Sequence, residues 1–215
     1  MGVSWVIQCP IADPAGRSLA QVYADYEKLL TSLGAERSGF FLVDSEPYYP
    51  NVNIPGLTST LHLCHSSEYP MTSFVLVSET SMSGITMPYV VADRNFDQIL
   101  SKLNAAFSPR SNLKIEAKGQ KFNLHDFTIR LSNVVVAGSA KGVIVEVDYN
   151  CCFVPNLCQG LMREFCSSLL GQIGQQPPVC IARFKDSQSY APIDTISQYF
   201  SIFLKYRQLQ QQQQT

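Results

Sequence analysis

Apolar residues recur at helical spacing in four stretches of the chain. The clearest stretch begins at Ser18, which forms a capping-box pattern with Gln21, and ends at Gly34, a residue typical of a left-handed helix cap. A second apolar stripe, from Phe96 onward, predicts a helix over about residues 95–107 that Pro109 brings to an end.

The third and fourth helices are predicted nearer the C-terminus. The third is expected to begin near Asn156, with Gln159 at the capping-box position, and the fourth follows Pro192. The residues expected to face the core are Leu157, Leu161, Phe165 and Leu169 in the third helix, and Ile196, Tyr199, Phe200, Phe203 and Leu204 in the fourth.

Alternating apolar and polar positions between these helices predict short β-strands. They are expected at residues 39–44, 58–65, 71–78, 85–92, 114–118, 121–131, 134–138, 143–149 and 179–184. Three prolines predict a loop over residues 45–56, and turns are expected at residues 79–84 and 139–142. Gly119 is expected to interrupt a strand, and a change of parity near His125 suggests a β-bulge or a strand that bends between two faces.

The order of these elements indicates the fold class α+β. Hairpin spacing without regular strand–helix alternation favours an antiparallel β-barrel, or a strongly curled sheet, flanked by helices. We expect a single domain over residues 1–207 and a short glutamine-rich tail over residues 208–215.

Charge is sparse for a soluble protein. Charged residues make up 15% of the chain and the formal net charge is -1. Either a partner buries part of this surface, or uncharged polar side chains solvate it. The scattered Lys and Arg residues argue against nucleic acid as a ligand. No apolar run approaches the roughly 18 residues that would span a bilayer, so we expect a soluble protein.

The seven cysteines are odd in number, and no signal-peptide pattern precedes them. They are expected to be reduced thiols, as in cytoplasmic or nuclear proteins. His62 and His65 fall on opposite faces of one strand, and Cys64 shares a face with His62. No zinc-like spacing links the cysteines, so buried structural thiols are the favoured interpretation.

Candidate catalytic patterns are few. Ser111 and Lys114 match Ser-x-x-Lys only by letters. Glu146 and Asp148 share one face of a strand, and with Glu116 they suggest an alternative function, a metal-dependent phosphohydrolase. Too few basic residues accompany them to bind a polyphosphate. The favoured interpretation is that Val145 and Val147 face the core while both carboxylates face water.

Several blocks, in order along nearly the whole chain, resemble the Mediator subunit 20 family. They are residues 1–3 (Met-Gly-Val), 33–36 (Leu-Gly-Ala-Glu), 65–70 (His-Ser-Ser-Glu-Tyr-Pro), 92–97 (Ala-Asp-Arg-Asn-Phe-Asp), 114–116 (Lys-Ile-Glu) with Gly119, 139–142 (Ser-Ala-Lys-Gly), 145–149 (Val-Glu-Val-Asp-Tyr), 194–195 (Asp-Thr) and 198–199 (Gln-Tyr). The glutamine-rich end matches as well. None of the blocks is a catalytic motif.

The resemblance implies a non-catalytic subunit of a nuclear coactivator. It implies a helix-flanked β-barrel that pairs with Mediator subunit 18, a C-terminal segment of subunit 8 joining the pair to the head module, and contacts with the RNA polymerase II machinery. The family's barrel is distantly similar to polyphosphate-tunnel enzymes, whose strand carries Glu-x-Glu-x-Lys; here Lys114 stands where the first Glu would be. No catalytic, cofactor-binding or metal-binding residue is therefore predicted.

Overall fold

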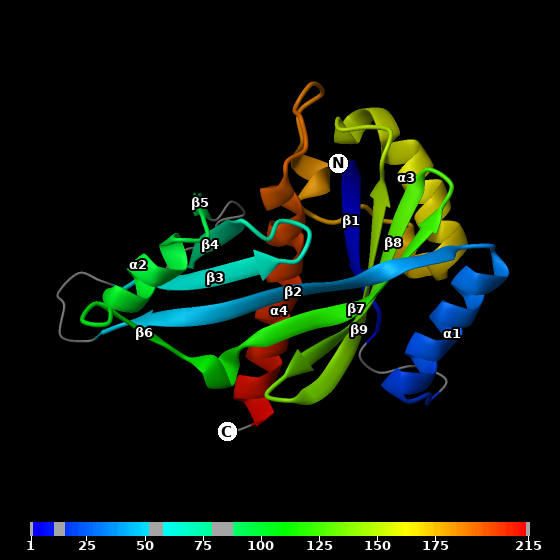
Figure 1. Ribbon diagram of the computed structural model, residues 1–215. Helices are drawn as coiled ribbons and strands as arrows, with labels where there is room; N and C mark the ends of the chain where they lie inside the picture. Colours follow the sequence, from blue (N-terminus) through cyan, green and yellow to red (C-terminus); the bar gives the residue numbers. More distant parts are fainter. Residues whose placement is uncertain (1, 11–15, 52–57, 79–87, 214–215) are drawn as a thin grey trace.

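A single curled antiparallel sheet organises the chain (Figure 1). The computed structural model describes residues 2–10, 16–51, 58–78 and 88–213, with side chains as far as Leu209. Within these residues the strand order is β1-β9-β8-β7-β2-β3-β4-β5, and β6 pairs with β2. The strands are β1 (Val3–Gln8), β2 (Glu36–Pro50), β3 (Thr60–Ser66), β4 (Thr72–Ser78), β5 (Tyr89–Asp93), β6 (Phe107–Pro109), β7 (Ile115–Leu124), β8 (Phe127–Val136) and β9 (Ser139–Tyr149).

The helices cover both faces of this sheet. They are α1 (Leu19–Ser32), α2 (Phe96–Lys102), α3 (Pro155–Leu170) and α4 (Pro192–Gln213). In Figure 1, α1 and α3 lie at one end of the sheet and α2 at the other, while α4 crosses the sheet on the opposite face. The end strands β1 and β5 do not pair with each other, so the sheet is a half-barrel open along one side. This confirms the predicted α+β fold class. Of the two predicted architectures, the structure has the strongly curled sheet flanked by helices.

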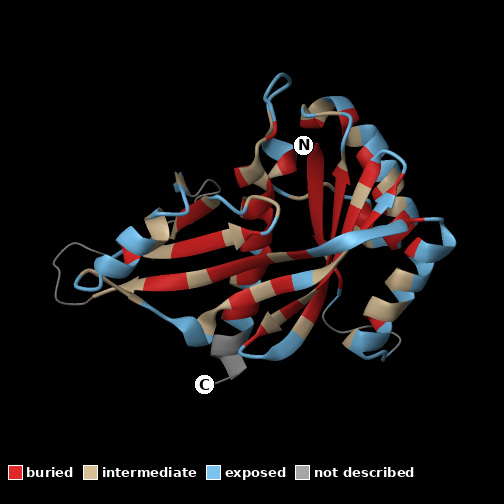
Figure 2. Cartoon of the chain, viewed as in Figure 1, coloured by how far each residue is buried: buried red, intermediate tan, exposed pale blue. Residues whose placement is uncertain are grey.

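The strands at the β1 end of the sheet are buried on both faces (Figure 2). In β9, Val145 and Val147 pack into a core with α1 and α3, whereas Ile144 packs into a second core with α4. We call the α4 side of the sheet the concave face. A polar residue of β9 that alternates with these valines therefore lies under α4 and not in water.

The predicted loop over residues 45–56 was wrong in its first half, because β2 continues to Pro50. Pro47 lies where the partner of β2 changes, after its pairing with β7 ends at Ser45 and before its pairing with β6 begins at Tyr48. The Pro47 carbonyl accepts from the amide of Arg110, which follows β6, so the backbone groups of Pro47 face the β6 side of the strand. The missing amide proton of proline would also have pointed to that side. A proline is tolerated at such a gap in the ladder.

The hairpin turns also lie elsewhere than predicted. Residues 125 and 126 form a tight turn, since Leu124 pairs with Phe127, so the suggested bulge and the suggested bent strand were both wrong. The next turn is Ala137-Gly138, both at positive φ, and not residues 139–142. Gly119 lies within an unbroken β7, where a Cβ atom would collide with the backbone of Leu131; glycine permits this close approach of two strands.

Two predicted helices and one strand also need correction. Helix α2 ends at Lys102, and residues 107–109 are strand β6. Helix α3 begins with Pro155 and has no side-chain cap. Of the predicted stripe, Leu157 and Leu161 are 78% and 43% exposed, so its first half does not face the core, whereas Leu169 is buried and Phe165 packs against the core as predicted. Its buried side chains are Pro155, Cys158, Met162, Cys166, Leu169 and Leu170. The strand predicted at residues 179–184 is a short 3-10 helix, Ile181–Arg183.

Other predictions were confirmed. Helix α1 has the expected capping box, in which Ser18 and Gln21 bond each other's backbone amides. Of the predicted stripe of α4, Ile196, Tyr199, Phe200 and Phe203 are buried and Leu204 is partly buried, and β3 and β4 form the predicted hairpin. The expected turn at residues 79–84 and the start of the expected strand at residues 85–92 lie outside the described residues.

Candidate functional site

Charged side chains from three adjacent strands, joined by Glu68, meet on the concave face. Arg130 of β8 donates through Nη1 to Oε1 of Glu146 at 2.8 Å and through Nη2 to Oε2 of Glu68 at 2.9 Å. Lys121 of β7 donates to the other oxygen of Glu68 at 2.9 Å. Oδ2 of Asp148 lies 3.6 Å from Nη1 of Arg130. These five residues, here called the ionic cluster, carry three negative and two positive charges when fully ionised.

Helix α4 covers the ionic cluster. The Tyr199 hydroxyl of α4 donates to Oε2 of Glu146 at 2.7 Å. Arg130, Glu146 and Asp148 are only 7%, 4% and 7% exposed. The interpretation that Glu146 and Asp148 face water was therefore wrong, because the second face of β9 packs against a helix instead of solvent.

Burial and charge act in opposite directions on these groups. Burial raises the pKa of Glu146 and of Asp148 above their usual values, and the positive charge of Arg130 offsets only part of that increase. Burial also acts to raise the pKa of Glu68, but its contacts with Lys121 and Arg130 prevail and lower it. Arg130 thus holds together carboxylates that would otherwise be costly to bury.

The sheet separates the three carboxylates proposed for phosphohydrolysis. Lys121 pairs directly with Arg130, and Arg130 with Glu146, so these side chains share the concave face. Glu116 lies five residues before Lys121 in the same unbroken strand and therefore points to the opposite face, where it contacts Lys114 at 3.1 Å. The residues do not converge on one metal ion.

The cavity beside the ionic cluster is also too small for a substrate. Its volume is about 20 Å³, room for roughly one water molecule. Among the described residues, no group of three or more His, Cys, Asp or Glu side chains is arranged to hold a metal. The Ser111 hydroxyl donates to Glu46, and Lys114 contacts Asp44 and Glu116, so these two residues do not form a catalytic pair. These contacts tie strands of the sheet to one another and to α4, and none of them forms a metal site or a catalytic pair among the described residues.

A second buried contact holds the C-terminal part of α4 against the sheet. Arg207 donates through Nη2 to the Ser45 carbonyl at 2.9 Å and lies 3.1 Å from Nδ1 of His62. Burial, and then the charge of Arg207, lower the pKa of His62 to about 3. His62 is therefore neutral at physiological pH, with Nδ1 accepting from Arg207 and Nε2 donating to Ser78 at 2.8 Å.

His65 links the sheet to α2 from the opposite face of β3, as predicted. Its ring lies 3.2 Å from Asp44 of β2 and 3.1 Å from Asp97 of α2. The hydrogen bond to Asp44, together with Asp97, raises the pKa of His65 above 6.5 despite partial burial. When protonated, the ring ties two carboxylates of different elements together.

Replacing His65 with Gln is expected to cost about 1 kcal/mol of stability below pH 6.5 and less above it. A histidine whose pKa is raised by folding contributes stability that is full below its unfolded pKa. That contribution is lost as the pH rises through the folded pKa. Urea unfolding of both proteins from about pH 5.5 to 8.5 measures the difference. The exposed turn variant His125→Asn serves as control, and a difference independent of pH would contradict this role of His65.

The seven cysteines are free thiols, and four of them, Cys9, Cys64, Cys158 and Cys166, are buried. Burial raises the pKa of Cys64 and of Cys166 to about 12, so neither is activated as a nucleophile. The Cys64 thiol approaches the His62 carbonyl at 3.8 Å. For these four residues the structural interpretation is confirmed.

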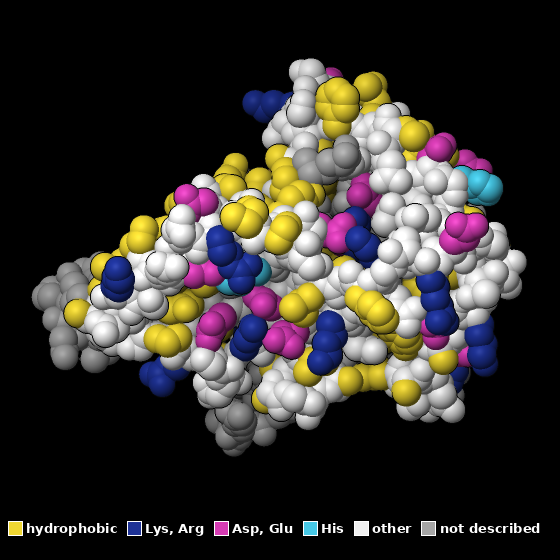
Figure 3. Space-filling model, in the orientation of Figure 1, with side chains coloured by type: hydrophobic (Ala, Val, Ile, Leu, Met, Phe, Trp, Pro, Cys, Tyr) yellow, Lys and Arg dark blue, Asp and Glu magenta, His cyan; other side chains and the backbone are white. Residues whose placement is uncertain are grey.

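The molecular surface offers an apolar region around β5. Tyr89, Val90 and Val91 are 55%, 49% and 50% exposed, and Met71, before β4, and Ile99 of α2 are exposed as well. Hydrophobic side chains gather over β4, β5 and α2 in Figure 3. No helix in the described part of the chain combines the length and the apolar character needed to cross a membrane.

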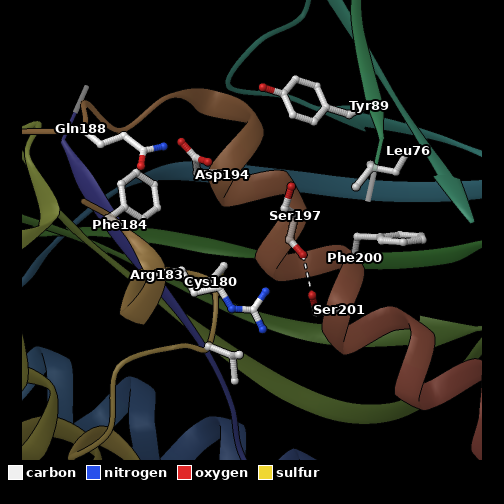
Figure 4. A pocket seen from close by; sticks show the side chains of 11 residues that line it. Leu76, Tyr89, Cys180, Arg183, Phe184, Gln188, Asp194, Ser197, Phe200 and Ser201 are labelled. Carbon is white, nitrogen blue, oxygen red and sulfur yellow. Dashed lines mark hydrogen bonds between the residues drawn. The ribbon is translucent and has the colours of Figure 1, made fainter. Parts of the chain in front are cut away.

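A groove runs between β5 and the segment that precedes α4 (Figure 4). Its volume is about 320 Å³. Tyr89 and Leu76 form one wall, residues 179–184 form the other, and Ser197, Phe200 and Ser201 of α4 form the floor. A second hollow of about 470 Å³ lies toward β1 and shares Val179, Cys180 and Ser201 with the first. Sequence patterns did not indicate either hollow.

Comparison with known proteins gives consistent sequence matches. Residues 1–204 match the family model described as "TATA-binding related factor (TRF) of subunit 20 of Mediator complex". Mediator of RNA polymerase II transcription subunit 20 from Mus musculus is 35% identical over 215 residues, covering 98% of this chain and 97% of the relative. The subunit from Anopheles gambiae is 36% identical, covering 90% of this chain and 91% of the relative.

Similarity to solved structures is weaker. A protein from Pyrococcus horikoshii (PH1012) gives a TM-score of 0.47 at 12% identity, covering 86% of this chain and all of that one. The Schizosaccharomyces pombe Mediator head module gives 0.34 at 11% identity, covering 67% of this chain and 78% of that one. At these scores and identities, neither likeness bears on function.

Proposed function

The chain belongs to the Mediator subunit 20 family, and we propose from this that it is a non-catalytic structural subunit of the Mediator head module. It acts as part of a coactivator that bridges regulators to RNA polymerase II and the initiation machinery, through contacts with other proteins. The observation that carries the proposal is the match to the family over residues 1–204, at about a third identity to relatives of similar length.

The interior of the half-barrel supports a non-enzymatic role. Helix α4 fills the concave face, where a substrate pocket would otherwise lie, and Tyr199 and Arg207 of that helix bond to the strands beneath it. The runner-up hypothesis, a metal-dependent phosphohydrolase, finds no support, because Glu116 lies on the other face of the sheet from Glu146 and Asp148.

The proposed partners are other head-module subunits. Subunit 18 forms a direct heterodimer with this chain, and a C-terminal segment of subunit 8 joins the pair to the rest of the module. The sparse charge of the chain and its exposed apolar side chains suit such contacts. The proposal includes no direct contact with nucleic acid, no cofactor and a nuclear location.

Co-purification tests the proposal. The tagged chain is expressed alone and together with subunits 18 and 8 of the same organism, and each preparation is analysed by size exclusion with light scattering. We expect a stoichiometric complex that is more soluble than the chain alone, because the partners cover apolar surface. A stable monomer that is indifferent to both subunits would overturn the proposed pairing. Phosphate release from tripolyphosphate with Mn²⁺, lost in Glu146→Gln, would overturn the non-catalytic role.

A further inference from the structure

Among the described residues, strand β5 is the end strand of the sheet and has backbone groups that no neighbouring strand pairs with. The Val77 amide donates to the Pro88 carbonyl, and the register pairs Val75 with Val90. Hydrogen-bonded pairs alternate along an antiparallel ladder, so Pro88 and Val90 direct their backbone groups toward β4. Tyr89 and Val91 therefore direct theirs away from it, toward the groove side of the edge.

The opposite edge of the sheet is sealed by side chains. In β1, the Val6 amide donates to the Gln198 side chain at 2.8 Å, and the Ser4 carbonyl accepts from Gln198 at 2.9 Å and from Tyr190 at 3.2 Å. Proteins protect exposed edges with such cover, or with charged residues, prolines or bulges. Pro88 precedes β5 and Asp93 ends it, but residues 89–92 between them (Tyr-Val-Val-Ala) contain neither charge nor proline, and Tyr89, Val90 and Val91 are about half exposed.

We propose that β5 receives an extended, uncharged segment of a partner protein, which adds to the sheet as a further strand and places apolar side chains in the groove beside it. Backbone hydrogen bonds to Tyr89 and Val91 would hold the segment in register, as in other cases of strand addition. This inference rests on the proposed function, since it assigns a surface to one of the predicted contacts between subunits.

The wall of the groove opposite Tyr89 and Leu76 favours a linear segment over a second copy of the chain. A strand added to β5 lies about 4.8 Å from it. A second copy paired edge to edge would bring its own β4 a further strand spacing outward, where residues 179–184 form the opposite wall. A single extended segment avoids that wall and packs against it.

The charges around the groove define the chemistry of the segment. Tyr89, Val179, Phe184 and Phe200 present apolar surface, and Ser197 and Ser201 are neutral, while Arg183 and Asp194 also line the groove and carry opposite charges. The carboxylate of Asp194 already accepts from the Ala191 amide. The edge itself offers no row of cations to a phosphate backbone, so the charge pattern fits an uncharged segment with alternating apolar residues.

The variant Val91→Pro tests the inference. Proline removes the outward amide of residue 91 and blocks close approach of another strand, while the bonds of Val90 to β4 remain. The matched control, Val91→Thr, keeps both the amide and a β-branched side chain. Each protein is co-expressed with subunits 18 and 8, and the Kd of the purified chain for each subunit is measured. We expect at least tenfold weaker binding of one subunit by Val91→Pro, and less than threefold change by Val91→Thr.

Amide hydrogen exchange of the unaltered chain gives a second measurement that does not depend on the folding of a variant. Exchange at Tyr89 and Val91 is expected to slow at least tenfold in the complex, because new backbone hydrogen bonds form there. Unchanged exchange at both residues, or equal binding by Val91→Pro and unaltered chain, would overturn the surface while leaving the proposed function standing. Self-association abolished by Val91→Pro would instead identify a second copy as the occupant. Absence of any complex with the unaltered chain would overturn both.

Discussion

Replacing Arg130 with Met is expected to lower the free energy of unfolding by about 3–5 kcal/mol. Arg130 contacts Glu68, Glu146 and Asp148, and it is 7% exposed. Methionine fills much of the same volume but leaves two buried carboxylates without their counter-ion, and uncompensated buried charge is among the most costly defects in a protein. Urea unfolding at neutral pH, followed by circular dichroism, measures the loss.

Lys121→Met is the matched control, because Lys121 lies opposite Arg130 in the ladder and also contacts Glu68. The Lys121 side chain is more exposed, and we expect Lys121→Met to cost less than about 1 kcal/mol.

Folding raises the pKa values of Glu146 and Asp148 above 4.5 and 3.8, and loss of Arg130 raises them further. A carboxylate whose pKa is raised by folding lowers the free energy of unfolding when the pH is above its folded pKa. This loss of stability disappears as the pH falls to the pKa of the unfolded state. A loss in Arg130→Met that is the same at pH 7 and pH 4 would contradict this explanation.

Local signals in the sequence predicted the elements that depend on local interactions. Ser18, Gln21 and Gly34 set the ends of α1 through contacts within a few residues, and the structure confirms them. The apolar stripe of α4 was also predicted, because its large side chains recur with one clear phase. Elements of this kind follow from propensity and capping without knowledge of their neighbours.

Burial on two faces was not predictable from the same pattern. Alternation in β9 shows that Val145 and Val147 share a face, but it does not reveal whether the other face meets water or another layer. Here α4, more than forty residues further along the chain, covers that face. Arg130 lies between the buried residues Ile129 and Leu131, and this alternation likewise does not tell whether the face that carries Arg130 is buried or exposed. The ionic cluster exists because residues far apart in the sequence meet under one helix.

Helix α3 shows a different limit. Its first half carries two apolar stripes, one of Leu157 and Leu161 and one of Cys158 and Met162, and hydrophobicity alone favours the leucines. The structure buries the cysteine and methionine and exposes both leucines. The choice depends on which side chains fit against the sheet, and small or flexible residues suit an irregular space. The sequence pattern also did not predict that β5 lies at the edge of the sheet, because strand order is a property of the whole fold.

Helix α4 joins the two regions described above, since it covers the ionic cluster with one side and forms the floor of the groove with another. Tyr199 reaches Glu146, whereas Ser197, Phe200 and Ser201 line the groove beside β5. A segment bound in the groove would therefore contact the same helix that holds the concave core together. Any change that displaces α4 is expected to remove both the core and the proposed binding surface.

Ending the chain at residue 191, and so deleting α4, is expected to abolish cooperative folding. The deletion removes seven large buried side chains from the concave core: Ile193, Ile196, Tyr199, Phe200, Ile202, Phe203 and Tyr206. Burying each contributes about 1.5–3 kcal/mol, so the loss of at least about 10 kcal/mol matches the whole stability of a typical domain. Thermal unfolding followed by circular dichroism should then show no sigmoidal transition.

A chain ending at residue 207 is the control for this deletion, and it also tests the predicted boundary between the domain and its glutamine-rich tail. This chain keeps all seven buried side chains and Arg207, whose side chain bonds the Ser45 carbonyl. We expect its free energy of unfolding to stay within about 0.5 kcal/mol of the full chain, because Gln208 and Leu209 are exposed. If the chain ending at residue 191 unfolds cooperatively, the sheet has a sufficient core without α4. If the chain ending at residue 207 is strongly destabilised, the domain extends into the tail.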